Sequence, residues 1–383
     1  MTRDQLLSPA LLPPGFIDLL PVDAQTEAEG TQALLSVFAS HGYERVAPPL
    51  LEFEDTLLGA GAGAALTEQA FRLMDPDTRR MMALRPDITP QIARIAATRL
   101  HGASRPLRLS YAGQAVLVGN GTAGQTERQI GQAGIELIGP DSAEADAEVV
   151  AVAAEALTRV GISNLSFDLT MPPLAPALIE QAGLSAAKAT ALMHALDRKD
   201  TAAVAEHGGP IAEVLMRLLS AAGDADQALA ALKEADLPAS VRPFSDRLMI
   251  SATAIRARVP DCQVTIDPVE FRGWKYHTGV CVSVYALGSS EELGRGGRYL
   301  CNDDEPACGL TLRPNAVFRT APRGPHPSRV YLPFGTAESV GRALRDKGYV
   351  TVAGLASHAP EEDEARRLAC SFLSRDGKIV PVT

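Results

Sequence analysis

Paired cysteines are missing from this chain. Its 383 residues include five cysteines, and none of them forms a Cys-x-x-Cys pair or a cysteine and histidine set with zinc spacing. The five are Cys262, Cys281, Cys301, Cys308 and Cys370. This absence excludes a zinc ribbon and a disulfide framework, and an odd number of thiols is typical of a reducing cytosol. We expect no bound metal and no cofactor.

An excess of positive charge and long apolar runs are also missing. The net charge is −10 without a long Lys or Arg run, which argues against a protein whose main task is to bind nucleic acid. No apolar run approaches the roughly 20 residues that cross a bilayer. The N-terminal sequence MTRDQLLSPALLPPGF has no uninterrupted apolar core before its prolines and predicts no secretory signal. We expect a cytoplasmic protein without nucleic-acid or membrane partners.

The most informative stretch runs from Arg108 to Gly139. Two runs with strand-like composition flank a polar connection at Gly119 to Gln125, which predicts an antiparallel hairpin. Alternate residues of a strand share a face, so Gln132 and Glu136 lie on one side, about 13 Å apart. That spacing suits the two ends of a small polar ligand, and an exposed sheet face is the alternative. The small neighbours that leave room beside them are Gly131, Ala133 and Gly134.

Composition divides the chain into a body and two additions. The 46% hydrophobic and 21% charged residues are typical of a globular protein of α/β class, of the α+β kind. Residues 172–243 are rich in Ala and Leu and predict a small helical insertion. We expect a core domain over residues 1–328 and a short C-terminal α/β appendage over 329–383, with one strand and one helix.

Local sequence signals predict helices and strands in the N-terminal third of the chain. Residues 26–41 predict a helix with a capping box at Thr26 and Glu29, and YERVAPPLLEF predicts an edge strand because of its two prolines. A second helix is expected from Pro90, with Thr89 as its N-cap and Asp87 near its positive end. The run GAGAGAA lacks the third glycine of a dinucleotide-binding loop. GRGGRYLC predicts a glycine-rich turn.

Several motifs in order resemble the catalytic core of class II aminoacyl-tRNA synthetases, specifically histidyl-tRNA synthetase. GYERVAPPLLE is similar to the dimer-forming first motif, LRPDIT to LRPEGT, RQIGQAGIE to RQFHQxGxE and RGWKYHTG to RGLDYYTG, while GGRY is retained. The resemblance covers roughly residues 14–317. It implies an antiparallel sheet flanked by helices, and a homodimer formed through the first motif.

The resemblance also implies a pocket for histidine. The corresponding residues are Asp87, Thr89 and Gln132 for the amino group, Glu136 and Tyr276 for the imidazole, and Arg272, Tyr299 and His277 for the rest of the pocket. An acidic group near an ammonium, and another beside an imidazole N–H, form charge-assisted hydrogen bonds. His277 replaces a tyrosine of the family and Lys275 replaces an aspartate. Taken singly, each residue also has a purely structural interpretation, such as a helix cap or a buried tyrosine.

The chain departs from the synthetases where ATP is held. Leu117 and Gly119 stand at the arginine and glutamate positions of the second motif, and Ala316 stands at the arginine of the third. Losing one such preorganised charge costs on the order of 100-fold in rate. The appendage is also only about half of the family's anticodon-binding domain. The resemblance therefore implies a protein that does not charge tRNA.

The same departures are found in the regulatory subunits of short-form ATP phosphoribosyltransferase, a family with this architecture. Membership implies a non-catalytic protein that joins a short catalytic subunit in a hetero-oligomer, expected to be a hetero-octamer. The complex condenses ATP with phosphoribosyl pyrophosphate in the first step of histidine biosynthesis. The pocket is then either a closed relic or a sensor of histidine, because regulation needs two states that differ in affinity for the effector.

Two alternatives stay open at this point. In the first alternative, the chain is an adenylate-forming enzyme that acts on something other than full-length tRNA. Arg272 and the pocket favour this interpretation. In the second alternative, the chain is a scaffold that binds no ligand. Replacing Glu136 by Ala then leaves the activity of the complex and its response to histidine unchanged.

Overall fold

The chain forms two compact units, which are described separately. A computed structural model describes residues 12–59, 61–119, 127–271, 273–274, 276–301, 304–322, 327–357, 360–375 and 378–382. The first unit spans Met1–Pro322 and the second Arg323–Thr383. In the described parts of the chain, no helix combines the length and the apolar character needed to cross a bilayer.

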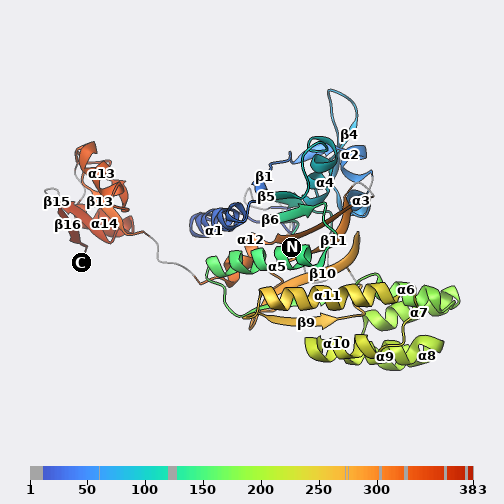
Figure 1. The fold of residues 1–383 in the computed structure, drawn as a ribbon. Coiled ribbons are helices and arrows are strands. Elements are labelled where there is room, and N and C mark those ends of the chain that lie inside the picture. Colours follow the sequence, from blue (N-terminus) through green and yellow to red (C-terminus); the bar gives the residue numbers. More distant parts are fainter. Residues whose placement is uncertain are drawn as a thin grey trace, which may run out of the picture. The chain divides into compact units, whose positions relative to one another are not determined.

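A nine-stranded mixed sheet organises the first unit (Figure 1). Its order is β1-β5-β6-β12-β11-β10-β7-β9-β8, and only the pairs β1–β5 and β7–β9 are parallel. The strands are β1 (Glu44–Arg45), β5 (Leu107–Val116), β6 (Gln129–Ile138), β7 (Leu165–Thr170), β8 (Gly223–Asp224), β9 (Gln263–Asp267), β10 (His277–Ala286), β11 (Gly294–Cys301) and β12 (Glu305–Leu312). The predicted hairpin is confirmed as β5 and β6, while residues 120–126 of its connection lie outside the described residues.

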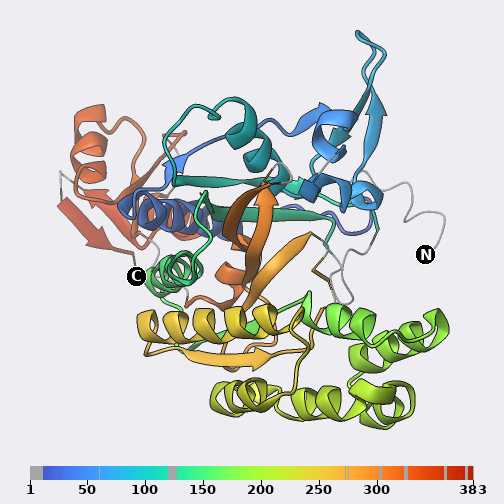
Figure 2. The same ribbon diagram turned by 45° about the vertical axis from the view of Figure 1, so that its right-hand side comes forward.

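Helices cover both faces of this sheet (Figure 2). One face packs against α1 (Pro21–Ser40), α5 (Ala143–Arg159), α11 (Arg242–Arg258) and α12 (Pro314–Thr320). The other packs against α4 (Thr89–Thr98). Its N-cap Ile88 and the helical Ile92 and Ala96 belong to one buried cluster with Leu109 and Ile138 of the hairpin. Alternation along β6 therefore sends Ile135 and Leu137 to the first face and Glu136 to the second.

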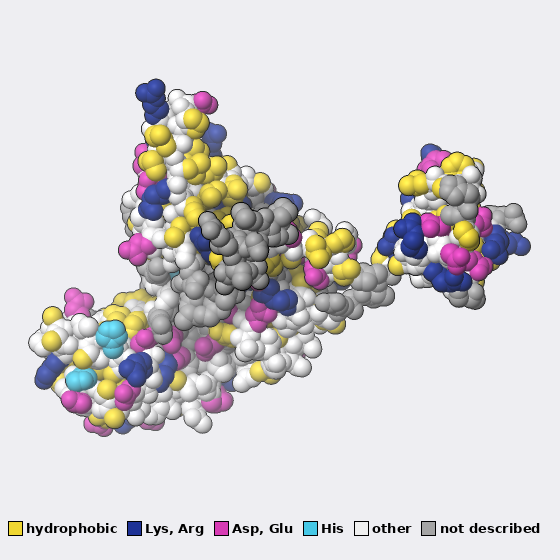
Figure 3. All heavy atoms as spheres, turned by 180° about the vertical axis from the view of Figure 1, so that it is seen from behind, with side chains coloured by type: hydrophobic (Ala, Val, Ile, Leu, Met, Phe, Trp, Pro, Cys, Tyr) yellow, Lys and Arg dark blue, Asp and Glu magenta, His cyan; other side chains and the backbone are white. Residues whose placement is uncertain are grey.

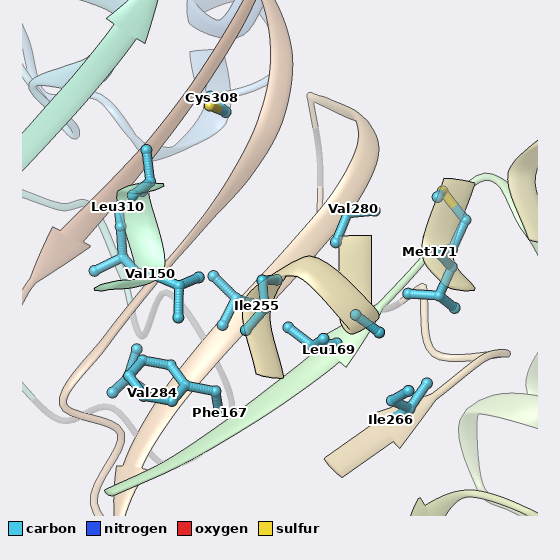
Figure 4. Close-up of a cluster of buried hydrophobic side chains, with 14 of the residues drawn as sticks. Val150, Phe167, Leu169, Met171, Ile255, Ile266, Val280, Val284, Cys308 and Leu310 are labelled. Carbon is cyan, nitrogen blue, oxygen red and sulfur yellow. The ribbon is translucent and has the colours of Figure 1, made fainter. Parts of the chain in front are cut away.

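The main core lies between the sheet and the pair α5 and α11. Figure 4 shows Val150 of α5 and Ile255 of α11 beside Phe167 of β7 and Val284 of β10. All four are at most 2% exposed. Burying a side chain of this size contributes roughly 1.5–3 kcal/mol. This core fixes the sheet that carries β6 and β11 toward the opposite face.

The residues from 172 to 243 are mainly helical and follow β7. They contain α6 (Leu174–Gln181), α7 (Ala186–Asp197), α8 (Thr201–His207), η3 (Gly209–Ile211), α9 (Ala212–Ser220) and α10 (Ala225–Glu234). In Figure 1 these helices gather at the β9 end of the sheet. Their inward leucines, including Leu192, Leu215 and Leu232, are continuous with the main core.

A separate three-stranded sheet, in the order β2-β4-β3, precedes α4. Its elements are β2 (Leu51–Phe53), α2 (Glu54–Leu58), α3 (Gly61–Ala64), η2 (Thr67–Gln69), β3 (Arg72–Met74) and β4 (Met81–Leu84). The single strand predicted for YERVAPPLLEF is wrong, because Pro48 and Pro49 lack N–H donors and separate β1 from β2. Both short strands lie at sheet edges, as the prolines predicted.

Two helix starts also differ from prediction. Helix α1 begins at Pro21, which preorganises its first turn, and Thr26 donates its hydroxyl to the Val22 carbonyl instead of capping. In α4 the N-cap is Ile88, and Thr89 is already helical. The Asp87 carboxylate accepts the Thr89 N–H at 3.2 Å and so caps the helix in its place.

The second unit holds more structure than the one strand and one helix predicted. It contains β13 (Arg329–Leu332), α13 (Glu338–Arg345), β14 (Val350–Ala353), α14 (Glu361–Arg367), β15 (Phe372–Arg375) and β16 (Lys378–Pro381). The sheet order is β14-β13-β15-β16, with parallel pairing on both sides of β13. The missed strands are only four residues long, so they carry little alternation for a sequence to show.

Candidate functional site

A pocket opens on the α4 face of the large sheet. Its walls come from the N-terminal turn of α4, from β6, β11 and β12, and from the residues that lead into β10. Seven of the eight predicted site residues line it, namely Asp87, Thr89, Gln132, Glu136, Tyr276, His277 and Tyr299. Arg272 lies outside the described residues, as does Lys275.

Glu136 is the deepest charged group of the pocket and is 1% exposed. Its Oε1 accepts the Thr89 hydroxyl at 3.0 Å and the Tyr111 hydroxyl at 3.1 Å, and its Oε2 accepts the Tyr299 hydroxyl at 3.0 Å. The Thr311 hydroxyl lies 2.6 Å from that of Tyr111. Among the described residues, all side chains that donate a hydrogen bond to Glu136 are hydroxyls. No positively charged side chain among these residues contacts it.

Burial dominates the electrostatics of this carboxyl group. It raises the pKa of Glu136 to about 8 from an ordinary 4.5, against the opposing effect of its hydrogen bonds with Thr89, Tyr299 and Tyr111. The Asp87 charge raises it further. Burial and the nearby Glu136 charge likewise raise the pKa of Tyr111 and of Tyr299 well above the ordinary value. Both tyrosines therefore remain protonated donors at neutral pH.

Asp87 forms a second acidic position at the N-terminus of α4. Its Oδ1 accepts the Gln132 amide N–H at 3.0 Å, and its Oδ2 accepts the Tyr276 hydroxyl at 3.2 Å. Gln132 in turn accepts the backbone N–H of Ile88 at 3.0 Å. This chain of bonds connects β6, α4 and the residues before β10. Gln132 and Tyr276 therefore both face Asp87, at the end of the pocket where the helix dipole favours negative charge.

Aromatic rings form the wall that leads into β10. The rings of Tyr276 and His277 are stacked, with centroids 4.4 Å apart, and Trp274 meets His277 edge-on at 4.9 Å. Burial, together with the positive charge of Arg295, lowers the pKa of His277 to about 3. The imidazole is therefore neutral at physiological pH.

Two arginines line another part of the pocket. Arg295 lies over the Trp274 ring at 4.6 Å and pairs with Glu292 at 3.0 Å. Arg313 pairs with the same carboxylate at 2.9 Å. Two guanidinium groups thus share one carboxylate, which leaves this part of the pocket positive beside the acidic part around Asp87 and Glu136. A ligand with both a cationic and an anionic group matches this arrangement.

Glycines give the Glu136 network its space. A Cβ on Gly309 of β12 would lie 1.8 Å from Glu136 Oε2, and one on Gly134 of β6 would lie 2.5 Å from the Tyr111 hydroxyl. The space that the small residues of β6 leave beside Glu136 is therefore partly filled by the side chain of Tyr111. Sequence reasoning missed Tyr111 and Thr311, although pairing Tyr111 opposite Gly134 in the hairpin register could have found the first.

The fold and the pocket define a class II aminoacyl-tRNA synthetase-like protein. A family model described as histidyl-tRNA synthetase matches residues 15–317. The solved structure of an ATP phosphoribosyltransferase regulatory subunit/histidyl-tRNA synthetase from Bacillus halodurans C has a TM-score of 0.79 and 24% identity, over 96% of this chain and 97% of that one. A chain of the ATP phosphoribosyl transferase complex from Thermotoga maritima shares the fold with a TM-score of 0.57 and 16% identity, over 78% of this chain and 98% of that one.

Sequence similarity then identifies the family. The ATP phosphoribosyltransferase regulatory subunit of Gluconobacter oxydans is 54% identical over 376 residues, which cover 98% of either chain. This chain belongs to the family of ATP phosphoribosyltransferase regulatory subunits. Its function is regulatory and lies in histidine biosynthesis, as the sequence predicted.

Proposed function

We propose that this chain joins the short catalytic subunit of ATP phosphoribosyltransferase in the cytoplasm, raises its activity and binds histidine in the pocket described above. The observation that carries the proposal is the 54% identity, over almost the whole of both chains, to a protein named as a regulatory subunit. Two homodimers of this chain assemble with four catalytic subunits, which gives a hetero-octamer with an equal ratio of the two chains.

An exposed apolar surface supports the homodimer. Leu50, Leu73, Met74 and Met81 of the small sheet and its flank are 40–64% exposed. Figure 3 shows apolar side chains gathered on this part of the molecule. All three residues of β3 are exposed, and β3 is an edge strand. Clustered apolar side chains beside an unpaired strand edge are typical of a protein interface.

The pocket supports histidine as the ligand. Its α-ammonium group belongs at Asp87, beside Thr89 and Gln132, and its imidazole belongs at Glu136. Among the described residues neither carboxylate has a cationic partner, so the ligand brings the charge that compensates them. The guanidinium groups of Arg295 and Arg313 line the same pocket, and their positive charge attracts the ligand carboxylate.

The ATP-holding positions support a role without amino-acid activation. Leu117 is 6% exposed and packs at the pocket wall, and Ala316 is 3% exposed within α12. Neither side chain offers a charge to a phosphate. Arg313 is already paired with Glu292, at 2.9 Å. Because phosphoryl chemistry depends on positioned cations, we expect no aminoacyl-adenylate from this chain.

Calorimetric titration with histidine tests the ligand, both on the isolated chain and on its complex with the catalytic subunit. We expect binding in at least one of the two states, with an affinity that differs between them, since a ligand that binds both states equally regulates nothing. No binding in either state would show that the pocket is a relic. Histidine-dependent exchange of labelled pyrophosphate into ATP should be absent, and its presence would favour the adenylate-forming enzyme instead.

A further inference from the structure

A buried guanidinium group lies behind the acidic end of the pocket. Arg85 is 6% exposed and is not one of the residues that line the pocket. All of its hydrogen-bond acceptors in the described part of the chain are uncharged. They include the carbonyl oxygen of Gln114 at 2.7 Å, that of Pro48 at 3.0 Å and the amide oxygen of Gln91 at 3.3 Å. Burying a charge among uncharged acceptors costs free energy and requires an explanation.

The main chain of Arg85 is held as firmly as its side chain. Its N–H donates to the Leu50 carbonyl at 3.1 Å, and its carbonyl accepts the Val116 N–H at 3.0 Å. The side chain adds the bond to Gln114 of β5 and the bond to Pro48, which lies between β1 and β2. Arg85 therefore fixes the chain that leaves β4 against two neighbouring segments.

Only Pro86 separates this fixed residue from Asp87. A proline ring fixes its own φ angle and restricts the backbone of the residue before it, so the turn from Arg85 to Asp87 has little freedom. The Asp87 carboxylate is held on its other side by Gln132 and Tyr276. Its place in the pocket therefore depends on Arg85 through the shortest and stiffest connection available.

The sheet leaves space for the guanidinium group at one glycine. A Cβ on Gly113 of β5 would lie 2.3 Å from Nη2 of Arg85. Gly113 pairs directly with Gln132 of β6, whose amide donates to Asp87 at 3.0 Å. The guanidinium group thus lies against the strand position opposite a hydrogen-bond partner of Asp87. Both connections from Arg85, along the chain and across the sheet, lead to the same carboxylate.

We propose that Arg85 is a positioning residue, which holds Asp87 where its carboxylate receives the α-ammonium group of the ligand. The inference rests on the proposed binding of histidine and deepens it. Arg85 lies outside the pocket walls, so it acts through Asp87 and not by touching the ligand. Its charge alone would act in the opposite direction, because a nearby cation repels an ammonium group. Weaker binding after its removal therefore measures a loss of geometry.

Calorimetric titration with histidine tests this role, in whichever of the isolated chain and the complex binds it. Arg85→Met removes the hydrogen bonds and keeps an unbranched side chain, so we expect binding about tenfold weaker. Gly113→Ala displaces the guanidinium group without removing it and should weaken binding by a smaller factor. Thermal unfolding shows which variants are folded. If Arg85→Met does not fold, Gly113→Ala takes its place in every measurement.

Arg94→Met is the matched control. Arg94 of α4 pairs with Glu52 at 2.5 Å, and Gln91 connects this pair to Arg85 by bonding to both Glu52 and Arg85. The control thus removes a second cation from the same polar cluster, but not one that holds the turn before Asp87. It should lose stability and bind histidine like the unsubstituted chain.

A double substitution shows whether Arg85 acts through Asp87. Asp87→Asn alone should weaken histidine binding by about tenfold, because it removes the charge that faces the ammonium group. Adding Arg85→Met should weaken binding by no more than about twofold further, since the two changes affect one interaction. An unchanged affinity of the folded Arg85→Met chain, or a full additional loss in the double variant, would overturn the inference and leave histidine as the ligand. No binding of histidine to the unsubstituted chain or its complex would overturn both proposals.

Discussion

At the scale of single residues, the site depends on a carboxyl group that is expensive to bury. Glu136 is surrounded by hydroxyls, and Gly309 approaches it so closely that no side chain fits between them. Hydrogen bonds from hydroxyls offset only part of the free-energy cost of burying a negative charge, and a nearby cation is needed to offset the rest. Burial therefore raises the pKa of Glu136, which keeps its carboxyl group protonated up to a higher pH than usual. This makes both stability and ligand binding dependent on pH.

Replacing Glu136 by Gln should remove a pH dependence of stability. The carboxyl group of the folded chain titrates at a pKa of about 8, against an ordinary value of 4.5. Between these values the folded state holds a proton that the unfolded state has released, so stability falls as the pH rises from about 5 to 8. Relative to the unsubstituted chain, Glu136→Gln should gain on the order of a few kcal/mol over this range.

Urea unfolding at several pH values measures this difference. The exposed Glu206→Gln substitution is the control and should leave the pH profile unchanged. A constant difference between Glu136→Gln and the unsubstituted chain from pH 5 to 8 would mean that Glu136 is already ionised in the folded state.

Gly309→Ala tests the close packing against Glu136. The new Cβ would lie 1.8 Å from Glu136 Oε2 and 2.7 Å from the backbone oxygen of Ile135, so one strand has to move. We expect a loss of stability of about 2 kcal/mol and weaker histidine binding. Gly102 has no atom within 4 Å of such a Cβ, so Gly102→Ala should stay within about 0.5 kcal/mol. Similar unfolding midpoints for both variants would contradict the packing described here.

At the scale of elements, an ionic connection between α5 and β11 holds the pocket floor. Arg298 of β11 donates to Asp146 of α5 at 3.1 Å and to the backbone oxygens of Pro140 and Ser142 at 3.0 Å. Arg247 and Ser251 of α11 bond to the same aspartate. Tyr299 follows Arg298 in β11 and points to the opposite face, where it bonds to Glu136. The ion pair therefore fixes the strand that supplies a donor to the site.

Arg298→Met should be strongly destabilising, because it leaves the buried Asp146 with fewer partners. We expect a loss of roughly 3 kcal/mol, at the low end for a broken buried pair because Arg247 remains. Arg217 pairs at the surface with the exposed Glu213 and Glu234, so Arg217→Met is the control and should change little. Chemical unfolding of both variants measures the difference, and equal effects would show that the α5–β11 connection is unimportant.

The elements also show where sequence reasoning succeeds and fails. Alternation along β6 and the polar connection predicted the hairpin, because these signals are local. The glycine-rich turn predicted for GRGGRYLC is wrong, since it forms β11. A Cβ on Gly296 would lie 2.0 Å from the Gly309 backbone oxygen, so these glycines serve close strand approach. Such a requirement comes from a partner strand, and the sequence of β11 alone does not reveal it.

The candidate site was also predicted only in part from the sequence. Motif resemblance found the residues that face the pocket, because their order along the chain is preserved. It did not find Tyr111 and Thr311, which support Glu136 from neighbouring strands. Local sequence signals assigned Thr89 to a helix cap, whereas its hydroxyl bonds to Glu136. These contacts depend on the register of β5, β6 and β12, which only the assembled sheet defines.

At the scale of the whole molecule, the chain combines a synthetase-like fold with a regulatory role. All described pocket residues belong to the first unit, and the second unit has its own small sheet and core. Leu117 and Ala316 are buried and apolar, while Asp87 and Glu136 make one end of the pocket acidic. This distribution fits the proposed function, in which the chain binds an amino acid and leaves the chemistry to its partner.

The most direct test of this account is the rate of phosphoribosyl-ATP formation by the short catalytic subunit from the same organism, with and without this chain. We expect a severalfold or larger stimulation, co-elution of the two proteins in equal ratio, and a response to histidine that requires this chain and weakens in Glu136→Gln. An unchanged rate without co-elution would contradict the account and make histidine-dependent adenylate formation the next hypothesis to test.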